Sequence, residues 1–167
     1  IESGRISLRL DWYDVADLFH RVAQNLKQEL ESFSLITFIP DDMPLARFDF
    51  ALMEHVMTNL LLNSLQHSSP GASLRMEAAH ENNNLVLRVS DSGPGFPPES
   101  LPRLFDKFFR IEGSPAGGLG LGLSIVRGLV EVHKGKVSAK NLAGGGAQFT
   151  ITIPSELPDM NNLNLSE

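Results

Sequence analysis

Residues 117–123 read Gly117-Gly118-Leu119-Gly120-Leu121-Gly122-Leu123 and lead directly into a helix predicted over residues 120–133. Ten of the fourteen glycines lie between residues 113 and 146, and this run is their densest part. Glycine lets a backbone approach a ligand closely, and a helix N-terminus offers unpaired N–H groups and a positive dipole end. The run therefore predicts a polyphosphate cradle. The alternative is a merely flexible loop, since no strand precedes the glycines directly, as a Rossmann fingerprint requires.

Hydrophobic periodicity around this run predicts three helices and six strands. One helix follows Asp14, which has the character of an N-cap, and its predicted apolar stripe runs from Val15 to Leu30. Another helix follows Asp49, and the third covers residues 120–133, with Ile125 predicted to face inward. Strands are predicted at residues 5–12, 35–40, 72–80, 84–91, 136–142 and 147–153. Because the strands arrive in hairpin-like pairs rather than in strict βαβ alternation, the predicted class is α+β. The architecture is a two-layer α/β sandwich with the three helices on one face of a mixed sheet.

The composition is that of an ordinary globular domain of 167 residues, 42% hydrophobic and 20% charged. Fourteen Lys and Arg against twenty Asp and Glu give a net charge of −6, which argues against a nucleic-acid partner. Cysteine is absent, so disulfides, thiol catalysis and Cys-ligated zinc are excluded. No apolar run reaches the roughly 20 residues of a membrane span, so we expect no membrane contact by this segment. Because the first residue is Ile, we expect a longer parent protein.

A second motif, Asp91-Ser92-Gly93-Pro94-Gly95, lies at the end of the strand predicted over residues 84–91. A carboxylate at this position can accept a hydrogen bond from an exocyclic amine such as that of adenine. Gly93 and Gly95 would let the chain turn around the ring. The alternative is a simple turn, since Asp, Ser, Gly and Pro all favour turns.

A third motif, Asn59-Leu60-Leu61-Leu62-Asn63, lies within the helix that follows Asp49. Residues i and i+4 share one face of a helix, so the two amides project side by side next to an apolar stripe. Buried amides cost stability unless a partner satisfies them, and a hydrated Mg²⁺ with attached phosphates would do so. The alternative is a solvated helix face.

The order of these motifs resembles that of the catalytic domain of sensor histidine kinases. Asn59 to Asn63, the Asp91 motif, the run Leu104–Arg110, the glycine run at residues 118–123 and Gly144-Gly145-Gly146 are similar to its N, G1, F, G2 and G3 boxes. The resemblance covers nearly the whole chain. It implies a Bergerat-type ATP-binding fold with a mostly antiparallel sheet. Trp12, residues 91–98 and residues 105–110 resemble potassium-sensing kinases of the Kdp type.

The resemblance also implies roles for single residues, with ATP and Mg²⁺ as the cofactors. Asp91 would bind the adenine amine, Asn63 would be the Mg²⁺ ligand, and Asn59 would line the same site, so Asn59 and Asn63 are the candidate catalytic residues. Arg110 would reach a phosphate or order a lid formed by residues 96–117, and Phe105, Phe108 and Phe109 would anchor that lid by packing. The candidate cofactor-binding residues are Asn59, Asn63, His67, Asp91, Gly93, Gly95, Arg110, Gly118, Leu119, Gly120, Leu121 and Gly122.

Two departures from the family pattern matter. Gln66 and His67 stand where the family often has Lys and Tyr, so the usual phosphate cation is missing. His67 would either replace that cation when protonated or stack beside the nucleotide, and we favour stacking. The phosphoacceptor histidine is also missing: the family carries it on an upstream helical hairpin, whereas His20, His55, His80 and His133 sit in other helix or strand contexts.

The resemblance implies a domain that transfers the ATP γ-phosphate to a histidine elsewhere. Its partners would be the protein's own dimerisation domain, which carries that histidine, and a response regulator. Residues 1–4 would end the upstream dimerisation helix, residues 5–155 would form the catalytic domain, and residues 156–167 would be a frayed tail. The domain would be cytoplasmic, in a protein anchored in the inner membrane. The alternatives are a conformational ATPase of the chaperone or gyrase type and a nucleotide-binding module without catalysis.

Overall fold

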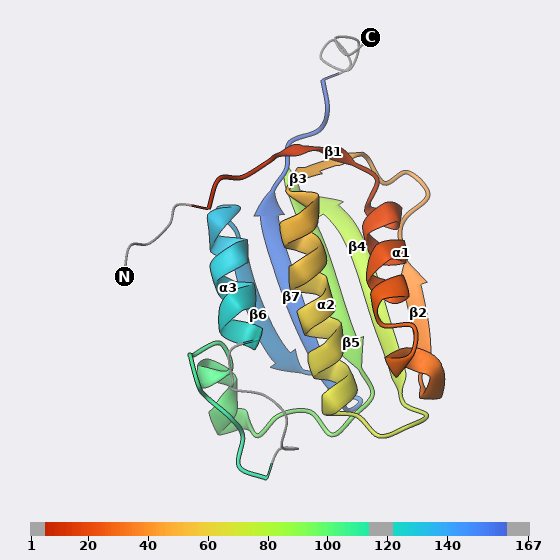
Figure 1. The fold of residues 1–167 in the computed structure, drawn as a ribbon, viewed down its shortest axis with the longest axis vertical. Coiled ribbons are helices and arrows are strands. Elements are labelled where there is room, and N and C mark those ends of the chain that lie inside the picture. The colour runs from red at the N-terminus through yellow and green to blue at the C-terminus, as the bar shows by residue number, and fades with distance from the viewer. Residues whose placement is uncertain (1–5, 114–121, 160–167) are drawn as a thin grey trace.

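Helices cover one face of a five-stranded sheet in this computed structural model, which describes residues 6–113 and 122–159 (Figure 1). The α-helices are α1 (Val15–Asn25), α2 (Phe50–Gln66) and α3 (Gly122–Val132), and two short 3-10 helices are η1 (Glu29–Ser32) and η2 (Pro98–Arg103). The strands are β1 (Asp11–Tyr13), β2 (Ser34–Phe38), β3 (Ala46–Phe48), β4 (Ser73–Glu81), β5 (Asn84–Asp91), β6 (Lys136–Asn141) and β7 (Ala147–Pro154). No helix in the described ranges is long and apolar enough to cross a bilayer.

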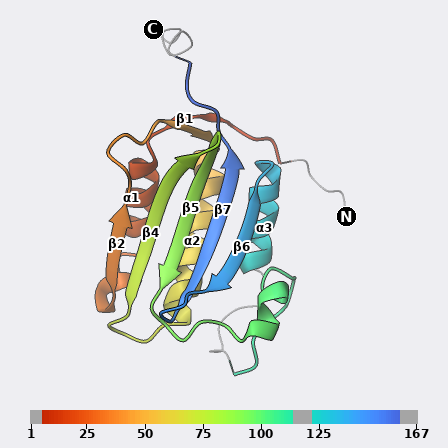
Figure 2. The same ribbon diagram turned by 180° about the vertical axis from the view of Figure 1, so that it is seen from behind.

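The main sheet has the strand order β2-β4-β5-β7-β6. Strands β2 and β4 run parallel, and the other neighbouring pairs are antiparallel. Seen from behind, the strands lie in front of α1, α2 and α3 (Figure 2). The predicted α+β sandwich, with three helices on one face of a mixed and mostly antiparallel sheet, is therefore confirmed.

The helices begin where local chemistry favours them. Asp14 caps α1, because its Oδ1 accepts a hydrogen bond from the backbone N–H of Ala16 at 2.9 Å. Asp49 caps α2 through the backbone N–H of Leu52 at 3.1 Å. Apolar residues at helical spacing then face the sheet, and Phe48 and Phe149 are among the largest side chains buried between the two layers.

A chain of hydrogen bonds joins residues 6–10 to both α2 and α3, and we call it the Asp49–His133 junction. The backbone N–H of Arg9 donates to Asp49 Oδ2 at 2.9 Å, and the backbone N–H of Asp49 donates to His133 Nε2 at 3.1 Å. Because Nε2 accepts, Nδ1 carries the proton, and it donates to the carbonyl of Leu129 in α3 at 2.9 Å. Asp49 and His133 are both buried, so this junction is shielded from water.

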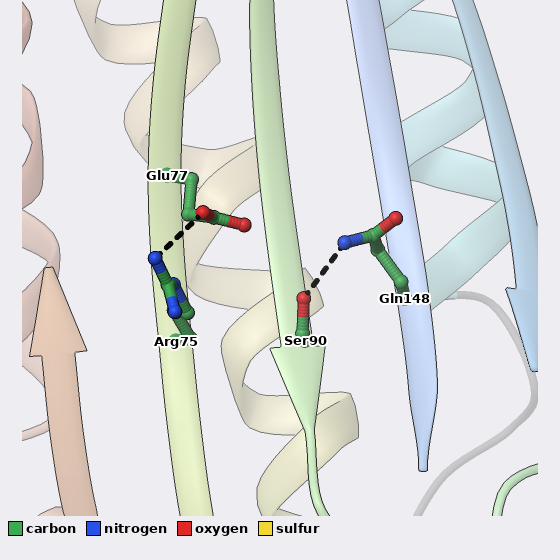
Figure 3. A network of polar contacts seen from close by, with 4 residues as sticks. All are labelled: Arg75, Glu77, Ser90 and Gln148. Atoms are coloured by element: carbon green, nitrogen blue, oxygen red, sulfur yellow. Dashed lines mark hydrogen bonds and ion pairs between the residues drawn. The ribbon is translucent and has the colours of Figure 1, made fainter. Parts of the chain in front are cut away.

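The sheet face opposite the helices carries polar side chains. Arg75 forms an ion pair with Glu77 at 3.0 Å along β4, and Gln148 of β7 donates to the hydroxyl of Ser90 in β5 at 3.1 Å (Figure 3). Polar side chains here leave this face wet while the helix-covered face forms the core.

Several predicted elements differ from the structure. The strand predicted at residues 5–12 is reduced to β1, which pairs with β3, a strand that the sequence did not predict. Residues 6–10 belong to no strand, because β3 offers only three residues for pairing. Leu30 does not continue the stripe of α1 but lies in η1. Ile125, predicted to face inward from the third helix, is 40% exposed.

Candidate functional site

Asp91 is the last residue of β5 and is buried against β7 and the turn that follows it. Its Oδ1 accepts hydrogen bonds from the backbone N–H of Gly93 at 2.9 Å and of Ala147 at 3.3 Å. Burial raises the pKa of Asp91, while these two N–H groups, the ring of His67 and the hydroxyl of Ser64 act to lower it. The backbone thus positions the carboxyl, and His67 is the basic side chain of the described residues that acts on it.

The chain around Asp91 requires glycine. A Cβ at Gly93 would lie 2.9 Å from the carbonyl of His67 and 3.0 Å from Asp91 Oδ1. Gly95 has a φ of +78°, and a Cβ there would lie 2.7 Å from Asn141 Oδ1. Gly146 has a φ of +94°, and its Cβ would overlap the carbonyl oxygen of Asp91. Gly93 and Gly95 were predicted site residues, whereas Gly146 was not.

Asn141, at the end of β6, holds the loop that follows the Asp91 turn. Its Oδ1 accepts from the backbone N–H of Phe96 at 2.8 Å, and its Nδ2 donates to the carbonyl of Phe96 at 2.7 Å. The ring of Phe96 packs edge-on against Phe149 and His67, with centroids 5.9 and 5.4 Å apart. Sequence reasoning missed Asn141, because an amide that bonds a distant backbone leaves no signal in local spacing.

Asn59 and Asn63 lie one turn apart on α2, as predicted. Asn59 Nδ2 and Asn63 Oδ1 are buried, and neither has a hydrogen-bond partner in the part of the chain that the structure describes. Buried polar atoms are nearly always bonded, so this pair fits a polar ligand. The unpaired atom of Asn63 is an oxygen, the ligand type that Mg²⁺ prefers, and that of Asn59 is a donor suited to an anion.

The described residues hold no group of three or more His, Cys, Asp or Glu that could bind a metal alone. A Mg²⁺ ion beside Asn63 would therefore take its other ligands from water and phosphate, which is how Mg²⁺ commonly binds in nucleotide sites. The residues present fit such an ion.

His67 follows α2 as its C-cap, and its ring is half-buried. Burial lowers the pKa of His67, and the nearby Asp91 carboxylate raises it by a smaller amount. The lowered pKa favours a neutral ring at neutral pH. A neutral ring is better suited to packing beside a nucleotide than to replacing the missing phosphate cation. A cavity of about 320 Å³ opens beside the ring, lined by residues 66–69, by Pro94, Gly95 and Pro97, and by residues 111–113.

The Phe-rich segment lies after η2 and packs only in part. Phe105 is buried edge-on against Phe149, with ring centroids 6.2 Å apart, and the guanidinium of Arg103 lies 4.7 Å from the ring centroid of Phe109. Phe108 has a φ of +63° and is 68% exposed, so the prediction that all three Phe anchor the lid is wrong for Phe108. Its backbone conformation turns the ring outward. Arg110 is exposed on the same segment.

The structure thus brings Asp91, Gly93, Gly95 and His67 together, with Asn59 and Asn63 on the helix that ends at His67. Gly122 is the exposed first residue of α3, which packs beside α2, and a Cβ at this position would meet no atom of the described residues within 4 Å. The predicted site residues Gly118, Leu119, Gly120 and Leu121 lie outside the described residues, as do residues 114–117 of the predicted lid.

The chain belongs to the family described as histidine kinase-, DNA gyrase B- and HSP90-like ATPases, which residues 49–157 match. It is similar to the sensor protein KdpD of Escherichia coli (strain K12), with 36% identity over 157 residues that cover 93% of this chain and 17% of KdpD. It is also similar to the alginate biosynthesis sensor protein KinB of Pseudomonas aeruginosa, with 31% identity over 155 residues that cover 92% of this chain and 26% of KinB. The chain thus spans about a quarter or less of these relatives.

Solved structures have the same fold. Full-length ShkA in complex with AMPPNP matches with a TM-score of 0.81 and 23% identity, covering 93% of this chain and 33% of ShkA. The nucleotide-free catalytic domain of the histidine kinase ThkA matches with a TM-score of 0.77 and 21% identity, covering 90% of this chain and 99% of that domain. The predicted class, an ATP-binding catalytic domain of the sensor histidine kinase type, is therefore confirmed.

Proposed function

We propose that this domain binds Mg²⁺–ATP and donates its γ-phosphate to a histidine on a dimerisation domain of the same protein. The observation that carries the proposal is the pair of unpaired amide atoms, Asn59 Nδ2 and Asn63 Oδ1, buried on the helix that also borders Asp91. A nucleotide with its metal would satisfy both atoms at once. Phosphoryl transfer needs positioning and charge neutralisation more than covalent chemistry from the protein.

The roles follow from which atoms are available. Asp91 would accept from the exocyclic amine of adenine, since its carboxyl is buried and fixed by backbone N–H groups. Asn63 would ligate Mg²⁺, which when bound neutralises phosphate charge. Asn59 would donate to a phosphate oxygen, and Arg110 would reach a phosphate or order the lid. The backbone of the glycine run, Gly118, Leu119, Gly120, Leu121 and Gly122, would hold phosphates at the start of α3.

The chain's own histidines support an acceptor elsewhere. His133 is buried with both ring nitrogens bonded, and His80 Nε2 bonds the carbonyl of Ser155 at 2.7 Å. His20 lies 3.3 Å from the side chain of Gln24 on α1, and α2 separates this helix from α3 (Figure 1). The acceptor would therefore lie on the dimerisation hairpin expected upstream, with a response regulator taking the phosphoryl group onward and the whole protein anchored in the inner membrane.

A conformational ATPase of the chaperone or gyrase type is the second candidate, and it needs a carboxylate to activate water. Asn59 stands at the position where the base is needed, one turn before Asn63, and an amide is a poor base. The nearest acidic residue on α2 is Glu54, whose Oε1 accepts from Asn25 Nδ2 of α1 at 2.8 Å. Glu54 is thus engaged on the α1 side of α2, which favours the kinase.

Nucleotide binding tests the site. Asp91→Asn removes the charge that pairs with the amine, so we expect ADP affinity in calorimetry to fall about ten- to a hundredfold, the effect of losing a charged hydrogen bond of about 1.5–3 kcal/mol. Asp14→Asn is the matched control, because Asn caps a helix as well as Asp does. Equal affinities in Asp91→Asn and the parent would refute the role of Asp91.

Labelled ATP tests the transfer. With Mg²⁺ alone we expect the domain to remain unlabelled and to hydrolyse ATP slowly, since no acceptor and no water-activating Glu are present. Addition of the upstream hairpin, and more so its covalent attachment, is expected to give acid-labile label on the hairpin, because tethering raises the effective concentration to about the millimolar range. Gly120→Ala with Gly122→Ala is expected to abolish it. Acid-stable label on Ser or Thr would contradict a histidine acceptor, and binding without transfer would identify the non-catalytic module.

A further inference from the structure

Ser64 carries a buried hydroxyl that neither the fold nor the proposed function explains. The residue is 1% exposed, and its Oγ has no hydrogen-bond partner within the described ranges. A serine inside a helix commonly bonds the carbonyl one turn earlier, and this one does not. An unpaired buried hydroxyl costs stability, so its retention here calls for a partner that arrives or reorganises with the ligand.

Ser64 lies on a different face of α2 from the amide pair. It follows Asn63 by one residue, which turns its side chain by about 100° around the helix, toward the sheet. On that side α2 packs against β5, the strand that ends at Asp91. Ser68, one turn further on, also has a buried unpaired Oγ, and this atom lies 3.1 Å from the space that a Cβ of Gly93 would fill, which Asp91 Oδ1 borders at 3.0 Å. Hydroxyls therefore approach Asp91 from α2.

Backbone groups leave part of the Asp91 carboxyl open. Both N–H groups that bond it, from Gly93 and Ala147, donate to Oδ1. Neither of these two backbone donors bonds the remaining oxygen, Oδ2, and a hydroxyl donor beside it would fix the plane of the carboxyl.

We propose that Ser64 is a positioning residue for nucleotide binding: its hydroxyl donates to Asp91 and holds the carboxyl turned toward the base. This proposal rests on the proposed function, since it takes Asp91 as the residue that binds the base. Ser64 would act through Asp91 and touch no ligand itself, which agrees with the complete burial of its Oγ.

The pH dependence of binding distinguishes this role from simple packing. Burial raises the pKa of Asp91, and the groups that oppose this are the N–H groups of Gly93 and Ala147, the ring of His67 at the end of α2, and Ser64. His67 is the titratable side chain among them. Loss of the Ser64 donor raises the pKa of Asp91 further, so affinity for ADP is lost at a higher pH as the solution is acidified.

The experiment measures ADP affinity between pH 4 and 8 for the parent, Ser64→Ala and Thr58→Val. In Ser64→Ala we expect affinity to fall about two- to tenfold at neutral pH, less than in Asp91→Asn because Ser64 acts on the base only through Asp91, and the acid midpoint of binding to move upward. Thr58→Val also removes a buried unpaired hydroxyl from α2, and its midpoint is expected to match the parent.

Asp91→Asn, measured in parallel, separates the two proposals. If it leaves ADP affinity unchanged, the proposed role of Asp91 in binding the base is wrong. If it weakens binding while Ser64→Ala leaves both affinity and midpoint unchanged, only the role of Ser64 is overturned. A lower melting temperature in Ser64→Ala with an unmoved midpoint identifies a packing role and also overturns it.

Discussion

Asp91 makes the ligand-free domain less stable than it would be without the charge. Because burial raises its pKa above the unfolded value, its contribution to stability is full in acid and is lost as pH rises through the folded-state pKa. Asp91→Asn keeps an oxygen for the N–H groups of Gly93 and Ala147 and removes the charge. We therefore expect the ligand-free variant to have a higher unfolding free energy than the parent at pH 7, measured in urea. The difference is expected to vanish below about pH 4.

His67 changes the unfolding free energy with pH in the opposite direction from Asp91. Burial lowers its pKa, so its neutral form is favoured in the fold, and stability is lost as pH falls below the ordinary pKa of histidine. A variant His67→Gln is expected to flatten the pH dependence of the unfolding free energy between pH 5 and 7. Asp91→Asn leaves that part of the curve in place, apart from the loss of the smaller charge effect of Asp91 on the ring.

Gly146 is the glycine whose replacement we expect to be most damaging among those of the loop at residues 144–146. An added Cβ would overlap the carbonyl of Asp91, and φ is +94°. Gly146→Ala is expected to lower the unfolding free energy by at least about 2 kcal/mol in urea denaturation. Gly144→Ala is the control, because a Cβ there meets nothing within 4 Å, and it is expected to stay within about 0.5 kcal/mol. Equal losses in both variants would contradict the overlap.

The sequence predicted the place of some site residues and not of others. Asn59 and Asn63 were predictable because their spacing is local and an amide beside an apolar stripe is costly. Asn141 was not predictable, and Gly146 was recognised only as part of a glycine motif, because each acts on backbone far away in sequence, at Phe96 and Asp91. Phe108 was expected to anchor the lid because the family resemblance implied it, but its φ is +63° and its side chain is 68% exposed.

Among the elements, α1 and α2 offer a matched pair of N-terminal caps. Asp14→Ala removes one exposed bond, to the N–H of Ala16, and is expected to lower the unfolding free energy by about 1 kcal/mol. Asp49→Ala removes the bond to Leu52 and leaves the N–H of Arg9 without its partner, so we expect a loss of about 2–3 kcal/mol. Urea unfolding measures both. Equal losses would show that the Arg9 bond adds nothing.

Elements with a long and regular pattern were predictable, and short ones were not. The hairpin of β4 and β5 was expected from two alternating runs around polar residues, and Asn82 and Asn83 adopt the positive φ that a tight turn needs. Strand β3 has only three residues, too few to show a period, and it exists because β1 lies antiparallel to it. The pairing with β1 therefore determines that residues 46–48 form a strand, which the local sequence pattern does not show.

For the whole molecule, nucleotide binding is expected to raise the melting temperature. Mg²⁺–ADP at a hundred times its Kd adds about 2.7 kcal/mol, which corresponds to roughly 5–10 °C for a chain of this size. In Asn63→Ala we expect the ligand-free melting temperature to be preserved, because Asn63 Oδ1 has no partner in the described residues, and the shift caused by Mg²⁺ to be largely lost. Unfolding of the variant, seen by circular dichroism, would instead identify Asn63 as structural.

The sandwich as a whole was predictable from the alternation of helices with paired strands, since each element must bury its apolar face against another layer. The order of the strands in the sheet was harder to predict from the sequence. The parallel pairing of β2 with β4, across the intervening α2, depends on contacts between segments well separated in sequence.

The Asp49–His133 junction has a mechanical consequence. It fastens residues 6–10 to the start of α2 and to the end of α3, and the opposite ends of these helices carry Asn63 and Gly122. Each helix is thus held at the junction, so that a tilt there moves its opposite end. A tilt of about two degrees over the roughly 25 Å of α2 displaces its far end by about 0.9 Å. Misplacement of a reacting group by about 1 Å can slow a reaction about a hundredfold, so a small rotation at the junction is enough to switch catalysis.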